Sequence, residues 1–330
     1  MKLYDVTLRD GNHALRHSLD PEFVRKYCRQ AEMSGSWAVE VGHGNGLGAS
    51  SYLVGKSKFA DEAILKAARE KLQTTLLAVH AIPGFATINN DIKPAIDLGV
   101  DLFRIATHVT EASVAEKHIE YLANKGKVVH GVLMMSHMST LENLLDQAKL
   151  MHNFGASAVI LMDSAGYFTP SQVAERVKII YQEIGLDLGF HAHNNLGVAI
   201  SNALAALSNG AVILDGASMG LGAGAGNAQL ELIAANLKKI GEVPSLDLDN
   251  YLQLSQLVEK EQAVWLPRTN SSSIESGFNG VFSGYAPQVK QISEEMGIPR
   301  GQLWNELAKR KLVAGQESMI REIANDLMNL

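Results

Sequence analysis

The sequence predicts a (β/α)8 barrel, the TIM-barrel fold, followed by a small helical C-terminal domain. Three observations support this prediction. Eight short β-rich runs alternate with amphipathic stretches. The runs start roughly 25 to 35 residues apart, which is the length of one βα unit. The alternation stops after Ser245. Eight is the strand count at which a parallel βα sheet closes into a barrel, and an open doubly wound sheet is the alternative.

The predicted elements carry recognisable start and stop signals. The stretch that follows the sixth run opens with Thr169 and Pro170 and ends at Gly185, a typical pattern for a capped helix. The predicted strands are residues 3–8, 38–41, 74–79, 102–106, 128–134, 158–162, 188–193 and 212–215. The clearest helical stretches between them are residues 60–71, 112–124, 140–153 and 170–184.

The C-terminal part of the chain lacks a strand pattern. Residues 247–264 and 293–330 are expected to be helical, and the Gly/Ser-rich stretch 268–284 is expected to separate them. We therefore expect a catalytic barrel domain over residues 1–245 and a helical domain over residues 246–330.

Composition excludes several classes of protein. Hydrophobic residues make up 46% of the chain and charged residues 19%, so a large core can form. The net charge is -6 and basic residues are not concentrated, so neither a nucleic acid nor a membrane is an expected partner. The single cysteine, Cys28, excludes an intrachain disulfide and is expected to be buried. Because no apolar run approaches about 18 residues and no signal peptide is evident, we expect a cytoplasmic protein.

Polar residues gather where the predicted strands end. The active site of a TIM barrel lies at these C-terminal strand ends, and seven of the 11 histidines fall there. A lone histidine is usually a packing residue, but this convergence predicts a polar, ion-binding mouth on an apolar barrel. The polar residues at the strand ends are Arg9, Asp10, His13, Glu40, His43, His80, His108, His137, Asp163, His191, His193 and Asp215.

The pair His191 and His193 is the most specific local indication of a metal site. Residues i and i+2 of a strand point to the same face, so both imidazoles can reach one cation. Asp10 can add a carboxylate across the barrel, which leaves about three positions open on an octahedral ion for a bidentate 2-oxo acid. These ligand types favour Mn²⁺, Mg²⁺, Co²⁺ or Fe²⁺, and Zn²⁺ is a further alternative. The alternative is a polar strand end with both histidines bonded to the backbone.

Arg9 and His13 are candidate catalytic residues. A fixed cation at Arg9 suits a developing enolate oxygen, and a salt bridge to Asp10 or Glu40 is the alternative. The imidazole of His13, with an ordinary pKa of about 6.5, suits removal of a C4 hydroxyl proton, and a plain loop histidine is the alternative. The glycine-rich run 220–227 comes too late in the chain for a dinucleotide fingerprint, so we interpret it as a turn with amides free for a carboxylate.

These residues together resemble the DRE-TIM, or HMG-CoA-lyase-like, metallolyases, through segment 5–11 with His13 and segment 191–194. Within that superfamily, the chain is similar to the 4-hydroxy-2-oxovalerate aldolases over nearly its whole length. The other matching segments are residues 40–44, 50–51, 106–108, 133–138, 162–164, 222–228 and 315–317.

The resemblance implies a metal site at Asp10, His191 and His193, usually for Mn²⁺ and with Mg²⁺ or Co²⁺ as substitutes, a base at His13 and an enolate-stabilising Arg9. It implies retro-aldol cleavage of 4-hydroxy-2-oxopentanoate to pyruvate and acetaldehyde. It also implies an acylating aldehyde dehydrogenase as partner, contacted by the helical domain, and hence a homo- or hetero-oligomer. The remaining candidates are His43, His80, Ser164 and Phe282 for substrate binding, and Asn227 and Glu40 for the outer coordination shell.

The sequence departs from the family pattern on the aldehyde side. The family loop Gly-Tyr-Ala-Gly-Val-Tyr corresponds to residues 277–282, where Phe278 and Phe282 replace both tyrosines. The family's leucine-rich turn after the third strand is replaced by residues 80–82, His-Ala-Ile. We therefore expect the pyruvate half of the site to be retained and the aldehyde, or the stereochemistry of the product, to differ.

Two other functions are compatible with the sequence. The first is a Claisen-type acyl-CoA condensing enzyme or lyase of the same superfamily, although the last glycine loop lacks the cysteine of HMG-CoA lyase. The second is an inactive scaffold for the dehydrogenase. A scaffold would have no reason to retain the five residues Arg9, Asp10, His13, His191 and His193.

Overall fold

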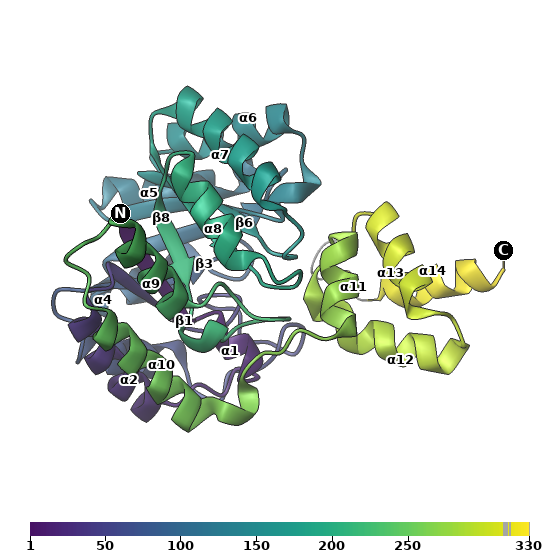
Figure 1. Ribbon diagram of the computed structural model, residues 1–330, viewed down its shortest axis with the longest axis horizontal. Helices are drawn as coiled ribbons and strands as arrows, with labels where there is room; N and C mark the ends of the chain where they lie inside the picture. Colours follow the sequence, from purple (N-terminus) through teal and green to yellow (C-terminus); the bar gives the residue numbers. More distant parts are fainter. Residues whose placement is uncertain (313–315, 317, 330) are drawn as a thin grey trace.

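The computed structural model describes residues 1–312, 316 and 318–329. Eight parallel strands in this part of the chain close into a barrel in chain order, with β1 paired to both β2 and β8 (Figure 1). The predicted TIM barrel is thus confirmed, and each predicted run coincides with one strand. The strands are β1 Lys2–Leu8, β2 Ala38–Val41, β3 Leu76–Ala81, β4 Leu102–His108, β5 Val128–Met134, β6 Ala158–Asp163, β7 Asp187–Ala192 and β8 Ala211–Gly216.

Helices surround the barrel and cover its outer face (Figure 1). The predicted stretch 112–124 is divided into a 3-10 turn, Ala112–Ala115, and the helix α5. The helices before the second domain are α1 Gly11–Ala14, α2 Pro21–Ser34, α3 Asp61–Arg69, α4 Lys93–Asp97, α5 Glu116–Asn124, α6 Leu141–Asn153, α7 Pro170–Ile184, α8 Ala199–Ser208, α9 Leu230–Ile240 and α10 Leu248–Gln262.

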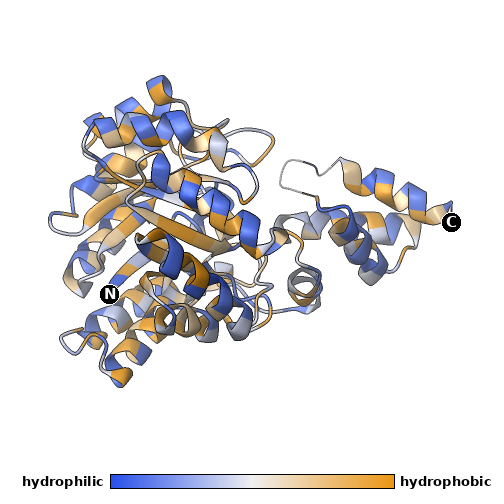
Figure 2. Ribbon diagram, turned by 90° about the horizontal axis from the view of Figure 1, so that it is seen from above, coloured by the Kyte–Doolittle hydropathy of each residue, from blue (hydrophilic) through white to orange (hydrophobic). Residues whose placement is uncertain are grey.

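Alternation along the strands divides the apolar residues into two clusters. Inward-facing residues such as Val6, Leu102 and Ile160 fill the lumen, whereas outward-facing residues such as Val39 pack beneath the helices. The strands accordingly form the hydrophobic centre of the molecule in Figure 2. Cys28 belongs to the outer cluster and is fully buried, as expected.

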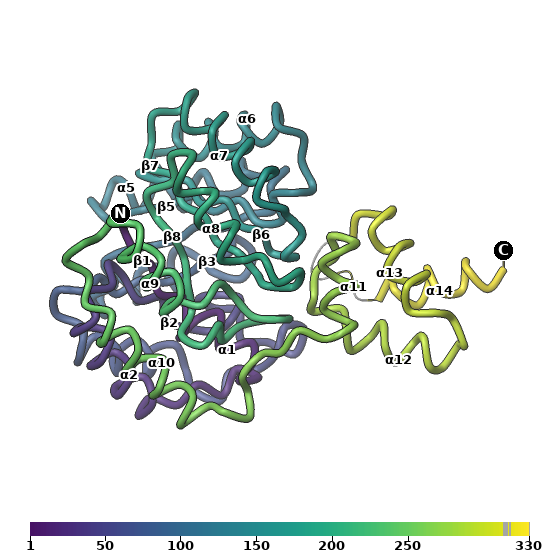
Figure 3. The backbone as a smooth tube through the Cα atoms, in the orientation of Figure 1, coloured from purple at the N-terminus to yellow at the C-terminus, as the bar shows by residue number. Residues whose placement is uncertain are grey.

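Helix α10 lies beyond the expected boundary at residue 245 but packs on the barrel, beside α2 and α9 (Figure 3). Its residues Tyr251, Leu254 and Val258 belong to the outer apolar cluster of the barrel. The helices after it form a separate lobe with an apolar core around Trp304. These are α11 Ser271–Asn279, α12 Ala286–Met296, α13 Arg300–Lys309 and α14 Met319–Met328.

The sequence-based prediction for this lobe was wrong in detail. The stretch 268–284 contains α11, which begins with a capping box at Asn270 and ends at Gly280 in the left-handed conformation. Within the expected helical stretch 293–330, Gly297 and Pro299 separate α12 from α13, because neither residue continues a helix. Part of the family-like tail segment 315–317 lies outside the described residues. No helix within the described ranges is long and apolar enough to cross a membrane.

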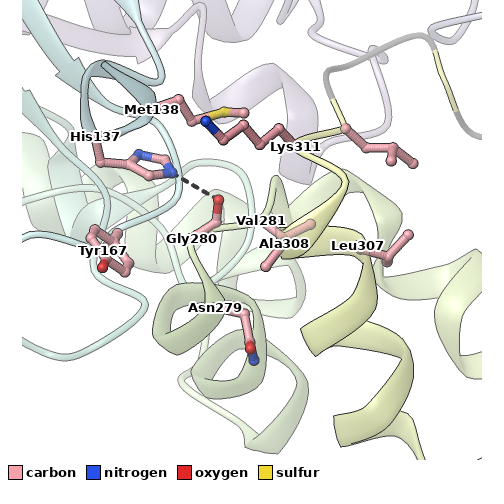
Figure 4. Close-up of a pocket in the computed structure, with 10 residues that line it drawn as sticks. His137, Met138, Tyr167, Asn279, Gly280, Val281, Leu307, Ala308 and Lys311 are labelled. Atoms are coloured by element: carbon pink, nitrogen blue, oxygen red, sulfur yellow. Dashed lines mark hydrogen bonds between the residues drawn. The ribbon is translucent and has the colours of Figure 1, made fainter. Parts of the chain in front are cut away.

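The helical lobe lies at the C-terminal ends of the strands. Buried Asn195, in the loop after β7, donates to Ser273 O at 3.1 Å and to Ser283 Oγ at 2.7 Å. Nε2 of His137, after β5, lies 2.8 Å from Gly280 O (Figure 4). The mouth of the barrel, where a TIM barrel carries its active site, is therefore flanked by the second domain.

Candidate active site

Asp10, His191 and His193 converge at the mouth of the barrel. Nε2 of His191 lies 3.3 Å from Nε2 of His193, and Asp10 Oδ2 lies 3.9 Å from each nitrogen. All three residues are buried. A triangle of this size allows one cation to reach all three atoms at ordinary coordination distances of about 2.0–2.2 Å.

The tautomer of His191 also suits a metal ligand. Nδ1 of His191 lies 2.9 Å from Oδ2 of Asp215, and a carboxylate can only accept, so Nδ1 carries the proton. The lone pair of the neutral ring is then on Nε2, which faces His193 and Asp10. A carboxylate behind the imidazole is the usual arrangement for a ligating histidine.

The carboxylate of Asp10 is fixed from the side opposite the imidazoles. Its Oδ1 accepts hydrogen bonds from Asn227 Nδ2 at 3.0 Å and from Ala223 N at 3.1 Å. The approach requires glycine at 222, because a Cβ there would lie 2.6 Å from Asp10 Oδ1. The amide of the glycine-rich turn thus binds a carboxylate of the protein itself. Burial alone would raise the pKa of Asp10, but Arg9 and the neighbouring histidines hold it well below its usual range.

These residues fit a divalent cation. The candidate ligands combine two nitrogens that can be neutral with one ionised oxygen, and burial lowers the pKa of His193 to about 4 despite the attraction of Asp10. Among the described residues, the histidine, cysteine and carboxylate side chains that cluster closely enough to hold a metal are these three. Such a two-histidine, one-carboxylate set leaves positions free for a substrate.

One terminal nitrogen of the Arg9 guanidinium is not used in hydrogen bonds among the residues that the structure describes. Nε lies 2.5 Å from Glu40 Oε1 and Nη1 lies 2.6 Å from Asp10 Oδ2. Nη2 is buried and has no hydrogen-bond partner within the described part of the chain. Since an unpaired buried donor is costly, this nitrogen is available for an oxygen of a ligand in the adjoining cavity. The salt-bridge alternative for Arg9 and its functional role are therefore compatible.

His13 lies beside the triad on the short helix α1. Its ring packs on the backbone of Gly44, where an added Cβ would lie 2.6 Å from the ring. Burial lowers the pKa of His13 to about 4, although the charge of Asp10 opposes this shift. The imidazole is therefore neutral near pH 7 and can accept a proton.

A cavity of about 240 Å³ adjoins these groups. Arg9, Asp10, His13 and His193 line its polar end, and the rest of its wall is mainly apolar. That wall comes from the C-terminal ends of several strands and from the loops that follow them, and one residue comes from the helical lobe. The remaining lining residues are Gly44, Asn45, Val54, His80, Ile82, Phe85, His108, Glu111, Met134, Met135, Met162, Ser164, Ala223 and Phe282.

Three of the four remaining candidates for substrate binding line this cavity, namely His80, Ser164 and Phe282. His43 is not among the lining residues. Its ring stacks on that of His17 with centroids 3.7 Å apart, and its Nε2 lies 3.0 Å from Gly55 O. The structure thus places His43 behind the cavity wall.

Other polar residues at the strand ends have structural partners. His137 lines a cavity of about 160 Å³ between the barrel and the helical lobe (Figure 4), not the one at the triad. Asp163 is fully buried and accepts hydrogen bonds from the backbone nitrogens of Tyr167 and Phe168. Phe278 is 74% exposed on α11, so of the two replaced tyrosine positions only Phe282 reaches the cavity.

Sequence reasoning overlooked Arg104. This residue interrupts the apolar strand β4 between Phe103 and Ile105. It has the inward parity of Leu102 and Ala106, so a charged residue in the lumen could have been recognised from the alternation alone. The apolar cavity wall was also overlooked, because methionines and loop residues carry no pattern that marks them as lining a site.

Fold and site together define a TIM-barrel enzyme with a candidate divalent-metal centre. The HMGL-like family model matches residues 1–258, and that of the DmpG-like communication domain matches residues 267–329. The chain is 48% identical to the 4-hydroxy-2-oxovalerate aldolase of Spirochaeta aurantia, over 98% of this chain and 95% of the relative. It is 46% identical to that of Pectobacterium atrosepticum, over the same shares of the two chains. The chain belongs to the 4-hydroxy-2-oxovalerate aldolase family.

Solved structures share the fold. The N-terminal domain of a Bacteroides vulgatus protein has a TM-score of 0.78 at 24% identity, over 89% of this chain and 98% of that one. The carboxyl transferase domain of Rhizobium etli pyruvate carboxylase has a TM-score of 0.82 at 17% identity, over 99% of this chain and 60% of that one. At these identities the likeness supports the fold alone.

Proposed function

We propose that this chain catalyses the reversible cleavage of a 4-hydroxy-2-oxo acid into pyruvate and an aldehyde. The observation that carries the proposal is one cavity whose polar end adjoins the Asp10, His191 and His193 triad, the free Nη2 of Arg9 and the neutral His13. Relatives at 46–48% identity are named for this reaction. We propose Mn²⁺ at the triad, with Mg²⁺ or Co²⁺ as substitutes.

The protein residues have separate roles in this proposal. Lewis acidity toward the 2-oxo group is what a divalent ion at the triad supplies. In the cleavage direction His13 accepts the C4 hydroxyl proton, the C3–C4 bond breaks, and its electrons pass to the pyruvate enolate as the aldehyde leaves. Nη2 of Arg9 donates to the developing enolate oxygen. Protonation of C3 then yields pyruvate.

We also propose an acylating aldehyde dehydrogenase as partner. Support comes from the match of residues 267–329 to a communication domain and from the position of this lobe at the mouth of the barrel. An aldehyde that leaves the cavity beside Phe282 is then close to the surface that the lobe offers. Assembly with such an enzyme would make the functional particle a hetero-oligomer.

Proton exchange tests the proposed function most directly. The protein is incubated in D₂O with pyruvate, with and without Mn²⁺, and then with a panel of aldehydes. We expect exchange of the pyruvate methyl protons and new aldol products only in the presence of the metal. Absence of metal-dependent exchange of the pyruvate methyl protons would contradict the proposal. Release of free CoA from acyl-CoA in the presence of pyruvate would instead support a condensing enzyme.

The pH dependence of turnover should report the neutral state of His13. A base with a pKa of about 4 remains unprotonated down to that pH, so kcat/KM should decrease only below about pH 5 and not near 6.5. The profile is measured with saturating Mn²⁺, and metal content is determined at each pH because His193 also titrates near pH 4. The His13→Asn variant should lose about 10²–10⁴-fold in kcat, whereas the exposed His152→Asn should not. An acid limb with its midpoint at 6.5 would contradict this assignment.

The aldehyde preference should depend on Phe282. Phe282→Tyr adds a hydroxyl group to a mainly apolar wall, so it should lower kcat/KM for pentanal relative to acetaldehyde by about tenfold. Competition between the two aldehydes in the synthetic direction, with chiral analysis of the products, measures the change. The matched control is Phe278→Tyr, the same substitution at an exposed position. It should alter neither the preference between the two aldehydes nor the ratio of product enantiomers. Equal behaviour of the two variants would show that Phe282 does not determine the preference.

A further inference from the structure

A chain of charged side chains crosses the lumen directly beneath the candidate active site. Arg104 on β4 and Asp215 on β8 form two parallel hydrogen bonds, with Nη1–Oδ2 at 2.5 Å and Nη2–Oδ1 at 2.8 Å. Both residues are buried, and the guanidinium carbon of Arg104 lies 3.3 Å from the ring centroid of Tyr4. Asp215 in turn contacts Nδ1 of the candidate ligand His191 at 2.9 Å.

The opposite side of Arg104 faces a second carboxylate. Glu40 Oε2 lies 4.0 Å from Arg104 Nε and accepts a hydrogen bond from the Tyr4 hydroxyl at 2.7 Å. Its other oxygen contacts Nε of Arg9 at 2.5 Å. Arg104 therefore lies between two buried carboxylates, and each of them holds one candidate residue of the active site.

Charges alternate along this chain, from Arg9 through Glu40 and Arg104 to Asp215. Two buried carboxylates without a cation between them would repel each other, and one would tend to take up a proton or turn away. The fork of the guanidinium also fixes the plane of Asp215, which a single ammonium group cannot do. These contacts connect β2, β4 and β8 with residues on β1 and β7.

We infer that Arg104 is a positioning residue for both halves of the active site. Through Asp215 it fixes the orientation and tautomer of His191, and through Glu40 it fixes the orientation of Arg9. Arg104 does not line the cavity and is not one of the three candidate ligands, so it acts through these two carboxylates. The kinetic part of this inference rests on the proposed function, whereas the metal-binding part does not.

Three substitutions separate the two branches. Asp215→Asn weakens the contact to His191 and should reduce Co²⁺ affinity by about 10–100-fold, with a changed Co²⁺ absorption spectrum. Glu40→Gln loosens Arg9 and should lower kcat while Co²⁺ affinity remains nearly that of the unaltered protein. Arg104→Met should do both, although Arg104 is not itself a candidate ligand. The matched control is Arg25→Met, which removes a guanidinium paired with Glu70 on the outer surface.

Co²⁺ affinity by titration calorimetry, the Co²⁺ spectrum, and kcat and KM with the hydroxy-oxo acid are measured for each folded variant. A folded Arg104→Met protein with unchanged Co²⁺ affinity, spectrum and kcat would overturn the inference, as would a change in melting temperature alone. If this variant does not fold, Arg104→Lys replaces it, and an affinity equal to that of the unaltered protein would be equally decisive against the inference. If the proposed function fails instead, turnover is absent in every protein while the Co²⁺ measurements still apply.

Discussion

Replacement of Asp10 by asparagine should lower kcat/KM by about 10³-fold, or about 4 kcal/mol of transition-state stabilisation. The oxygen of the new amide can still accept from Asn227 and Ala223, so the contacts on that side should persist, whereas the contact of Arg9 Nη1 with Oδ2 is lost. Its nitrogen would replace Oδ2, the atom that faces both histidines, and an amide nitrogen is no metal ligand. The variant should thus fold normally and lose its metal.

Calorimetric titration with Mn²⁺ and steady-state kinetics measure these two effects. Mn²⁺ affinity should decrease by at least about 100-fold, since the loss of a ligand exceeds the loss of a group that only orients one. The matched control is Asp146→Asn, which removes an exposed carboxylate on α6. A variant with the Mn²⁺ affinity of the unaltered protein would remove Asp10 from the proposed ligand set.

Arg9→Lys should lower kcat by about 10²–10³-fold with a much smaller change in KM. A lysine keeps the charge, but its single ammonium cannot contact Glu40, Asp10 and a substrate oxygen in the fixed directions of the guanidinium. The missing contact is the one expected to strengthen as the enolate forms, which is why the effect should appear in kcat.

Metal titration distinguishes Arg9→Lys from Asp10→Asn. Mn²⁺ affinity should change by about tenfold at most, because Arg9 contacts Asp10 without being a ligand. Arg25→Lys, on the surface of α2, provides the control for a loss of guanidinium geometry elsewhere. If kcat were unchanged in Arg9→Lys, the spare donor at Nη2 would have no role in the reaction.

The sequence was sufficient to predict the barrel and, to within two residues, the ends of its strands. Alternation places every second residue of a strand in the lumen, and the same rule predicts that His191 and His193 share a face. The convergence of these two with Asp10 could be predicted because closure of eight strands brings β1 next to β8. Local pattern and global topology are consistent here, which makes such elements predictable.

Contacts that depend on loops or on distant pairing could not be predicted in this way. The orientation of His43 is set by its stacking on His17, within a loop that no periodicity governs. Alternation identifies Arg104 as inward-facing, but not that its partner is Asp215, which lies 111 residues away in the chain. Likewise, α11 depends on a capping box within a Gly/Ser-rich stretch that was expected only to separate two helical regions.

The contribution of Phe282 to the cavity wall has a mechanical consequence. This ring belongs to the helical lobe, where it packs against Tyr285, yet it borders the chamber in which the carbon–carbon bond would break. A rotation of the lobe of even a few degrees would therefore alter the width of that chamber. A contact on the outer surface of the lobe that rotates it would therefore also change the opening past Phe282 through which the aldehyde would leave.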